Sequence, residues 1–284
     1  MRRTNPKEES EESEDSAGRR SRCCCLPGGI ILGDSGAVRH QTRGHAPTIR
    51  RIQPPGNEEE DEESEESEEH ASTTTATPVP SNFWMKMHES FVAEAKGSEA
   101  DVVFLGDSLI QYMKNFDVWK KFFEPLGSLN FGIGGDQTQH VLWRVQNGEL
   151  QGFSPRIVVL LVGTNNFADS ASAVAAGVFS VVEAVLSRQE ETRVIAVEIP
   201  PKGQKPNRSR ETFAAVNAIV AEKLSGVERA RFLSIGWSAW VGEGGEISNL
   251  DMFDYLHFTQ RGYEKLCQPL AEEIQNVLGE FGPQ

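Results

Sequence analysis

Short apolar runs alternate with longer amphipathic stretches from about residue 81 to the end of the chain. The runs are residues 101–105, 128–131, 156–162, 193–199 and 231–235. Residues 157–162 are continuously apolar, which is typical of parallel strands that are covered on both faces. The stretches 173–186, 212–224 and 262–278 repeat apolar residues every three to four positions, as amphipathic helices do. This alternation predicts an α/β fold, a three-layer flavodoxin-like domain around a five-stranded parallel sheet.

Residues 1–80 differ in composition from the rest of the chain. They contain no Phe, Trp or Tyr, and the block from Glu58 to Glu69 is acidic except for Ser64 and Ser67. Such a segment buries too little apolar surface to offset the entropy of ordering its backbone. We expect a disordered acidic leader over 1–80 and one folded domain over 81–284. The acidic run is either a phosphorylated interaction tail or a solvating leader without a specific partner.

The net charge of −14 argues against nucleic-acid binding, which needs clustered Lys and Arg. No apolar stretch reaches the ~18–20 residues of a membrane span, so no transmembrane segment is expected. The first residues lead into acidic and Ser-rich sequence rather than the apolar core of a secretory signal. These features together predict a cytoplasmic protein.

The four cysteines suggest neither a disulfide framework nor a metal site. Cys23, Cys24 and Cys25 are adjacent, and no further ligand lies at metal-site spacing. The triplet follows several arginines, so it is either palmitoylated or without a role. Cys267 lies in an amphipathic helical stretch and is expected to be a buried, small apolar residue. No metal or organic cofactor is expected.

Four short motifs stand in a fixed order along the predicted domain. Gly106–Leu109, Gly132–Asp136 and Gly163–Asn166 each follow an apolar run, and Asp254–His257 comes near the end. In parallel sheets the ligand site lies beyond the carboxyl ends of the strands, so the first three motifs should meet there. Together the motifs contain a hydroxyl nucleophile, hydrogen-bond donors and an acid–base pair, which are the parts that serine acyl transfer needs.

Ser108 is the candidate nucleophile, because a serine where a strand turns into a helix is exposed at the sheet edge. The alternative role is an ordinary helix N-cap. A second Gly-Asp-Ser sequence at 33–35 also follows an apolar stretch, but it lies in the leader and is expected to be a decoy. Asp107 is expected to stabilise the turn through hydrogen bonds between its side chain and the backbone rather than to orient the base.

His257 is the candidate general base, because it has a carboxylate, Asp254, three residues before it. Asp254 is expected to hold the imidazole in the tautomer that accepts the serine proton, with Asp251 as the alternative acid. His88 and His140 are expected to be packing or surface residues.

Two residues are candidate oxyanion donors besides the Ser108 amide. Gly135 offers a backbone N–H without an obstructing Cβ, and Asn165 offers its side-chain amide. The alternative is that Gly135 and Asn165 are ordinary turn residues without a catalytic role. The same alternative, a surface turn, applies to the Asp254–His257 pair.

These motifs, in this order, resemble those of the SGNH (GDSL) hydrolase superfamily. From about residue 83 to 278 the chain is similar to the catalytic α subunits of intracellular type I platelet-activating factor acetylhydrolase. The similarity is carried by the stretches 131–136, 140–144, 147–150, 162–166 and 251–257. Two departures are visible: Phe167 stands where a histidine is expected, and the cluster at 199–203 differs modestly.

The resemblance implies a catalytic triad of Ser108, His257 and Asp254, with oxyanion contacts from the Ser108 amide, Gly135 and Asn165. It also implies a tight acyl pocket near Leu109, Thr164 and Leu256, which suits an acetyl group.

The implied substrate is a phospholipid-like acetyl ester, and the implied partners are a second or related α subunit and a WD40-repeat regulatory subunit. The alternatives are an esterase for an acetylated sugar or aryl ester, and a non-catalytic binding subunit.

Overall fold

The computed structural model describes residues 72–282 and contains a five-stranded, all-parallel sheet. The strand order is β2-β1-β3-β4-β5, so β3 is the middle strand and β2 and β5 form the edges. The strands are β1 (Val102–Gly106), β2 (Leu129–Gly132), β3 (Ile157–Leu161), β4 (Arg193–Val197) and β5 (Ala230–Leu233). The five apolar runs therefore form the five strands, and the predicted α/β class and parallel sheet are confirmed.

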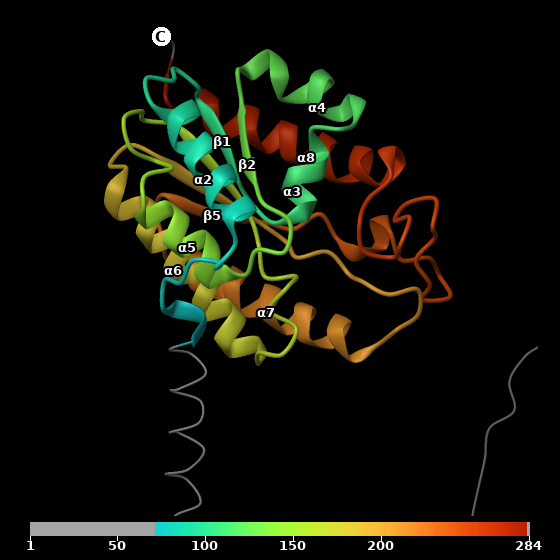
Figure 1. The fold of residues 1–284 in the computed structure, drawn as a ribbon. Coiled ribbons are helices and arrows are strands. Elements are labelled where there is room, and N and C mark those ends of the chain that lie inside the picture. Colours follow the sequence, from blue (N-terminus) through green and yellow to red (C-terminus); the bar gives the residue numbers. More distant parts are fainter. Residues whose placement is uncertain (1–71, 283–284) are drawn as a thin grey trace, which may run out of the picture. The chain divides into compact units, whose positions relative to one another are not determined.

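Helices cover both faces of the sheet and make three layers (Figure 1). One face carries α2 (Asn82–Ala95), α5 (Thr138–Gln146), α6 (Ala171–Arg188) and α7 (Arg208–Leu224). The other carries α3 (Ser108–Met113), α4 (Asp117–Phe122) and α8 (Gln260–Gly279). Two short 3-10 helices, Glu124–Leu126 and Trp237–Ala239, lie in the connections. The three predicted helical stretches correspond to α6, α7 and α8.

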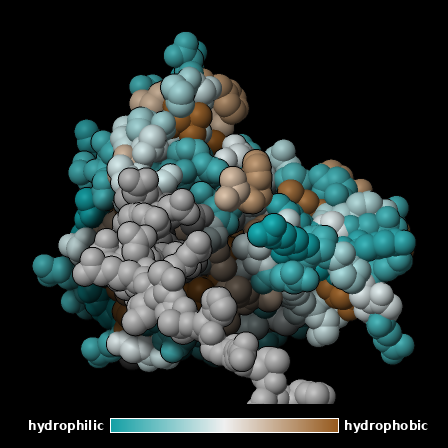
Figure 2. All heavy atoms as spheres, turned by 90° about the horizontal axis from the view of Figure 1, so that it is seen from below, coloured by the Kyte–Doolittle hydropathy of each residue, from teal (hydrophilic) through white to brown (hydrophobic). Residues whose placement is uncertain are grey.

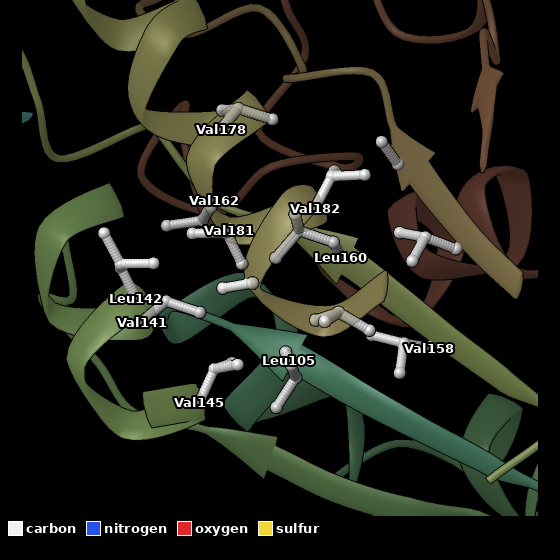
Figure 3. Packing of buried hydrophobic residues seen from close by; sticks show 14 of the residues in the cluster. Leu105, Val141, Leu142, Val145, Val158, Leu160, Val162, Val178, Val181 and Val182 are labelled. Atoms are coloured by element: carbon white, nitrogen blue, oxygen red, sulfur yellow. The ribbon is translucent and has the colours of Figure 1, made fainter. Parts of the chain in front are cut away.

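Successive residues of the strands point to opposite faces of the sheet and pack into two separate cores. On the first face, Val103, Leu105, Val158 and Leu160 pack with apolar residues of α5 and α6. Figure 3 shows this packing, with valines of α6 lying over the strands. On the other face, residues such as Phe104 pack with α3, α4 and α8. Cys267 of α8 is fully buried in that second core, as expected, and its burial raises the pKa of its thiol.

Helix α6 is long and apolar enough to cross a membrane by length and composition, which the sequence analysis did not anticipate. Half of this 18-residue segment is buried, because it packs on the sheet beside α5 and α7. Core helices of globular proteins meet the same criterion, so packing accounts for the apolar character of α6. The described surface in Figure 2 is mostly hydrophilic, with small and separate hydrophobic areas.

The packed region extends N-terminal to residue 81. Thr73 is fully buried, and its hydroxyl donates a hydrogen bond of 2.8 Å to the carbonyl of Ala173 in α6. Thr77 N–H donates to the carbonyl of Gln139 in α5. Helix α2 begins at Asn82, but the packed residues before it show that the folded region starts earlier than the predicted boundary at residue 81. The rest of the predicted leader, including Cys23–Cys25 and the second Gly-Asp-Ser at 33–35, lies outside the described residues.

Candidate active site

Ser108 is placed by a tight junction between β1 and α3. A Cβ on Gly106 would lie 2.1 Å from the Leu161 carbonyl oxygen, so only glycine fits the end of β1. Asp107 is the N-cap of α3, and its Oδ1 accepts a hydrogen bond of 2.9 Å from the Leu109 N–H. Ser108 is thus the first residue of α3 at the carboxyl edge of the sheet. The predicted strand-to-helix turn is confirmed.

A chain of hydrogen bonds joins Ser108, His257 and Asp254. The Ser108 Oγ lies 2.9 Å from His257 Nε2, although the two residues are 149 positions apart. His257 Nδ1 lies 2.7 Å from Asp254 Oδ2. Because an ionised carboxylate only accepts, Nδ1 carries the proton and Nε2 accepts from the serine hydroxyl. The structure therefore brings the three predicted triad residues together in the order that nucleophile activation needs.

The loop around Asp254 holds this carboxylate in place. Its Oδ1 accepts hydrogen bonds from the N–H groups of Leu256 (3.0 Å) and His257 (2.7 Å). Tyr255, which lies between Asp254 and Leu256, has φ 63°, a left-handed conformation that is uncommon for a bulky residue. Burial alone raises the pKa of Asp254, but the hydrogen bonds from His257 and Leu256 outweigh it and lower the pKa below the ordinary value. The carboxylate is therefore ionised at neutral pH.

Two aromatic rings flank the His257 imidazole. Phe253 stacks on it with ring centroids 5.8 Å apart, and Tyr112 lies tilted at 5.2 Å. Both aromatic side chains are exposed, with 55% of Phe253 and 36% of Tyr112 accessible. Sequence reasoning did not identify either residue. The only available signal was their position: Tyr112 is four residues after Ser108 and Phe253 four before His257.

Asp251, the alternative acid, is engaged elsewhere. It forms ion pairs with Arg261 (2.7 Å) and Lys265 (2.9 Å) of α8, which lower its pKa. Asp254 rather than Asp251 is the carboxylate hydrogen-bonded to the His257 ring.

Gly135 lies in a turn beside Ser108. Its φ is +86°, and its Cβ position opens into free space. The neighbouring Gly134 is held by Gln111, whose Oε1 accepts a 3.0 Å hydrogen bond from the Gly134 N–H. A Cβ on Gly134 would lie 3.6 Å from the Ser108 Cβ, which places the glycine turn next to the candidate nucleophile. Sequence reasoning missed Gln111, which lies one helical turn after Ser108.

Asn165 directs its side-chain amide toward two acceptors. Its Nδ2 donates to the carbonyl of Asp136 at 2.9 Å and contacts Asp107 Oδ2 at 3.5 Å. The first distance is that of a normal hydrogen bond, whereas the second is long. One amide hydrogen is therefore firmly held, and the other is only weakly engaged.

Asp107 is fully buried directly before Ser108. Burial raises its pKa to about 7, and the hydrogen bond from the Leu109 N–H offsets only part of this rise. Because the ordinary value is 3.8, the folded protein binds a proton at pH values where the unfolded chain does not. Stability therefore falls as the pH rises from about 4 to about 7, by up to about 4 kcal/mol.

The variant Asp107→Asn should lack this pH dependence while keeping an oxygen acceptor for Leu109. We expect the free energy of unfolding of the variant, minus that of the wild type, to rise between pH 4.5 and 7.5 in urea titrations. Asp117→Asn, which alters an exposed carboxylate in the first turn of α4, is the control and should leave the difference flat. Parallel profiles for Asp107→Asn and the wild type would contradict the buried-acid interpretation.

The three predicted acyl-pocket residues differ in burial. Leu109 is fully buried in the core beneath α3, and Thr164 is 3% exposed. Leu256 lines a surface hollow with Asp254 and Tyr255. That these three residues together line an acyl pocket stays a prediction.

His88 is buried and His140 is partly buried. His88 Nδ1 contacts Glu149 Oε1 at 2.9 Å, and His140 Nδ1 accepts from the Gln137 N–H at 3.0 Å. Within residues 72–282, no group of three His, Cys, Asp or Glu side chains is arranged to hold a metal ion.

Known proteins have sequences and folds similar to those of this chain. Residues 104–265 match the GDSL-like lipase/acylhydrolase family. Platelet-activating factor acetylhydrolase IB subunit alpha1 from Bos taurus is 47% identical over 195 residues, covering 69% of this chain and 84% of that protein. Subunit alpha2 from Rattus norvegicus is 43% identical over 197 residues, covering 69% and 86%.

A solved structure extends the comparison to the fold. A putative acylhydrolase from Bacteroides fragilis superposes with a TM-score of 0.60 at 20% identity, covering 70% of this chain and 100% of that chain. The matched family region contains all four motifs, from Ser108 to His257. The chain therefore belongs to the GDSL-like lipase/acylhydrolase family and is a carboxylic ester hydrolase.

Proposed function

We propose that this enzyme is a serine acetylhydrolase that removes the sn-2 acetyl group from phospholipids of the platelet-activating-factor type. The observation that carries the proposal is the hydrogen-bond chain from Ser108 Oγ through His257 to Asp254. The names of the Bos taurus and Rattus norvegicus relatives, which are acetylhydrolase subunits, support the choice of substrate.

Catalysis starts with proton transfer from Ser108 to His257. The serine oxygen attacks the ester carbonyl, and Nε2 of His257 takes the proton. Asp254 stabilises the imidazolium through Nδ1 and does not itself become protonated. His257 then returns the proton to the leaving alcohol, and an acetyl-enzyme on Ser108 remains. Water, deprotonated by the same imidazole, attacks this intermediate and releases acetate.

The negative charge that develops on the carbonyl oxygen is stabilised by three donors, the N–H groups of Ser108 and Gly135 and the amide of Asn165. The weakly engaged hydrogen of Asn165 turns from Asp107 to the oxyanion. Each such donor contributes about 10²–10³ in rate. Leu109, Thr164 and Leu256 limit the acyl group to a short chain.

A chain-length series tests the substrate assignment. Glycerophospholipids that carry acetyl, butyryl or hexanoyl groups at sn-2 should be hydrolysed with kcat/KM falling from acetyl onward. We expect about 10-fold or more per two added methylenes, because a filled pocket excludes extra atoms. Equal rates for all three chains, or a strong preference for an acetylated sugar, would contradict the proposal.

The names of the relatives also support a complex of related subunits. We infer a homodimer or a dimer with a related α subunit, located in the cytoplasm, that binds a WD40-repeat regulatory subunit. Analytical ultracentrifugation of the purified chain should give a dimer, and a monomer at all concentrations would oppose this inference.

A further inference from the structure

A surface hollow lies directly beside the triad carboxylate. Its volume is about 470 Å³, and residues 254–256 form one wall. The other wall is the loop after β4 and the first turn of α7, with Lys202, Gly203, Asn207, Arg208 and Ser209. A second hollow of about 450 Å³ shares Arg208 and Ser209 and runs along Phe167 and Phe213. We call the first of these the Lys202–Arg208 hollow.

Lys202 and Arg208 bring two positive charges to this hollow. The Lys202 Nζ lies 5.0 Å from the ring centroid of Phe213 and 5.7 Å from that of Phe167. Within the described part of the chain, neither cation forms an ion pair with a carboxylate. Partial burial lowers the pKa of Lys202, because its ammonium group has lost hydrating water. An anionic ligand would supply the missing partner.

The loop that carries these cations is held firmly by hydrogen bonds. Asn207 Nδ2 donates to the carbonyls of Lys202 and Lys205, both at 2.8 Å. The Arg210 guanidinium donates to the carbonyls of Lys202 (3.1 Å), Gly203, Gln204 and Gly245. Arg210 therefore has a structural role. Because these hydrogen bonds fix the loop, the hollow is preorganised and a ligand need not order it on binding. The amino end of α7 adds its positive partial charge.

The acidic groups at the two hollows are already satisfied. Asp254 accepts hydrogen bonds from His257 Nδ1 and from two backbone N–H groups. Asp169, in the second hollow, accepts from Asn166 Nδ2 at 2.8 Å. Lys202 and Arg208 thus stay unmatched in a protein whose net charge is −14.

We propose that Lys202 and Arg208 bind the phosphodiester group of the substrate's leaving alcohol. The assignment rests on the proposed function, which puts the ester carbonyl at Ser108, one hydrogen-bonded residue away from Asp254 in the wall of the hollow. Arg208 offers the planar fork of donors that matches phosphate oxygens, and Lys202 adds a point charge. The substrate class is therefore acetyl esters whose alcohol carries a phosphodiester. These contacts orient the ester without taking part in the chemical steps.

Comparing a substrate that carries a phosphodiester with one that lacks it separates a loss of phosphodiester binding from a loss of catalysis. Lys202→Met and Arg208→Gln should each lower kcat/KM for a soluble 2-acetyl glycerophosphocholine about 10–100-fold, mostly through KM. Hydrolysis of a neutral aryl acetate should change less than about twofold, because that ester never reaches the hollow. Lys202→Met keeps an apolar stem over Phe167 and Phe213. The control is Lys205→Met, at an exposed lysine of the same loop that does not line the hollow.

Inhibition of 2-acetyl glycerophosphocholine hydrolysis identifies the anion. Glycerophosphocholine should inhibit the wild type, and both variants should need about tenfold more of it. Inorganic phosphate that inhibits as well as glycerophosphocholine would overturn the phosphodiester assignment in favour of a general anion site. Equal losses on both esters, or no loss on either, would also overturn it. Phospholipid hydrolysis that survives Ser108→Ala would instead contradict the proposed function itself.

Discussion

Replacing Ser108 by alanine should lower kcat for acetyl ester hydrolysis about 10⁶-fold, because no other group can form the acetyl-enzyme. His257→Ala should cost about the same, since the two residues act as one unit. Stopped assays on an aryl acetate with each purified variant measure the loss. The double variant should be no slower than either single one, and additive losses would contradict a shared role.

The acid partner can be assigned by comparing two aspartates. Asp254→Asn should lower kcat about 10⁴-fold, because an amide at this place favours the wrong tautomer of His257. Asp251→Asn should leave kcat close to the wild-type value and lower stability instead, since it weakens the ion pairs to Arg261 and Lys265. A larger loss of kcat in Asp251→Asn than in Asp254→Asn would reverse the assignment.

The second large effect concerns a buried ion network beneath the glycine turn. Arg144 is fully buried, forms ion pairs with Asp136 (2.8 Å) and Glu149 (2.6 Å), and donates hydrogen bonds to the carbonyls of Phe131 and Gly106. Arg144→Met should lower the free energy of unfolding at pH 7.5 by about 3–5 kcal/mol, because two buried carboxylates lose their counter-ion. Urea titration of the wild type and the variant measures the difference.

The pH dependence of this loss identifies its electrostatic cause. Burial raises the pKa of Asp136 to about 6 even beside Arg144, so the carboxyl takes up a proton readily when the arginine is gone. The cost of Arg144→Met should therefore be smaller at pH 5 than at pH 7.5. Arg156→Met, which breaks the partly exposed pair with Asp101, should cost less than about 1 kcal/mol. A loss that small for Arg144→Met would contradict the network's role.

The strands and the motif order could be predicted because their physical signals are local. A continuously apolar run such as 157–162 indicates a covered strand, and glycines that follow such runs mark the carboxyl ends of the strands. Observed strand ends differ by at most a few residues: β3 stops at Leu161 and β4 at Val197. The pairing of Ser108 with His257 followed from chemistry rather than spacing, because acyl transfer needs a base for the serine.

The surroundings of the triad could not be predicted, because they depend on contacts between distant segments. Trp84 donates to Asp136 at 2.6 Å across 52 positions, and nothing in either residue's neighbourhood indicates it. Gln111, Tyr112 and Phe253 are ordinary polar and aromatic residues until the fold brings them to the site. The proposed role of Lys202 and Arg208 likewise depends on the hollow that they line, which the sequence does not indicate.

Mapping the serine that a fluorophosphonate modifies in the full chain tests the central claim most directly. Mass spectrometry of the digested, labelled protein should find the adduct on Ser108 alone. Labelling should vanish in Ser108→Ala and persist in Ser35→Ala. An adduct on Ser35, or an unlabelled protein, would contradict a nucleophile activated by His257.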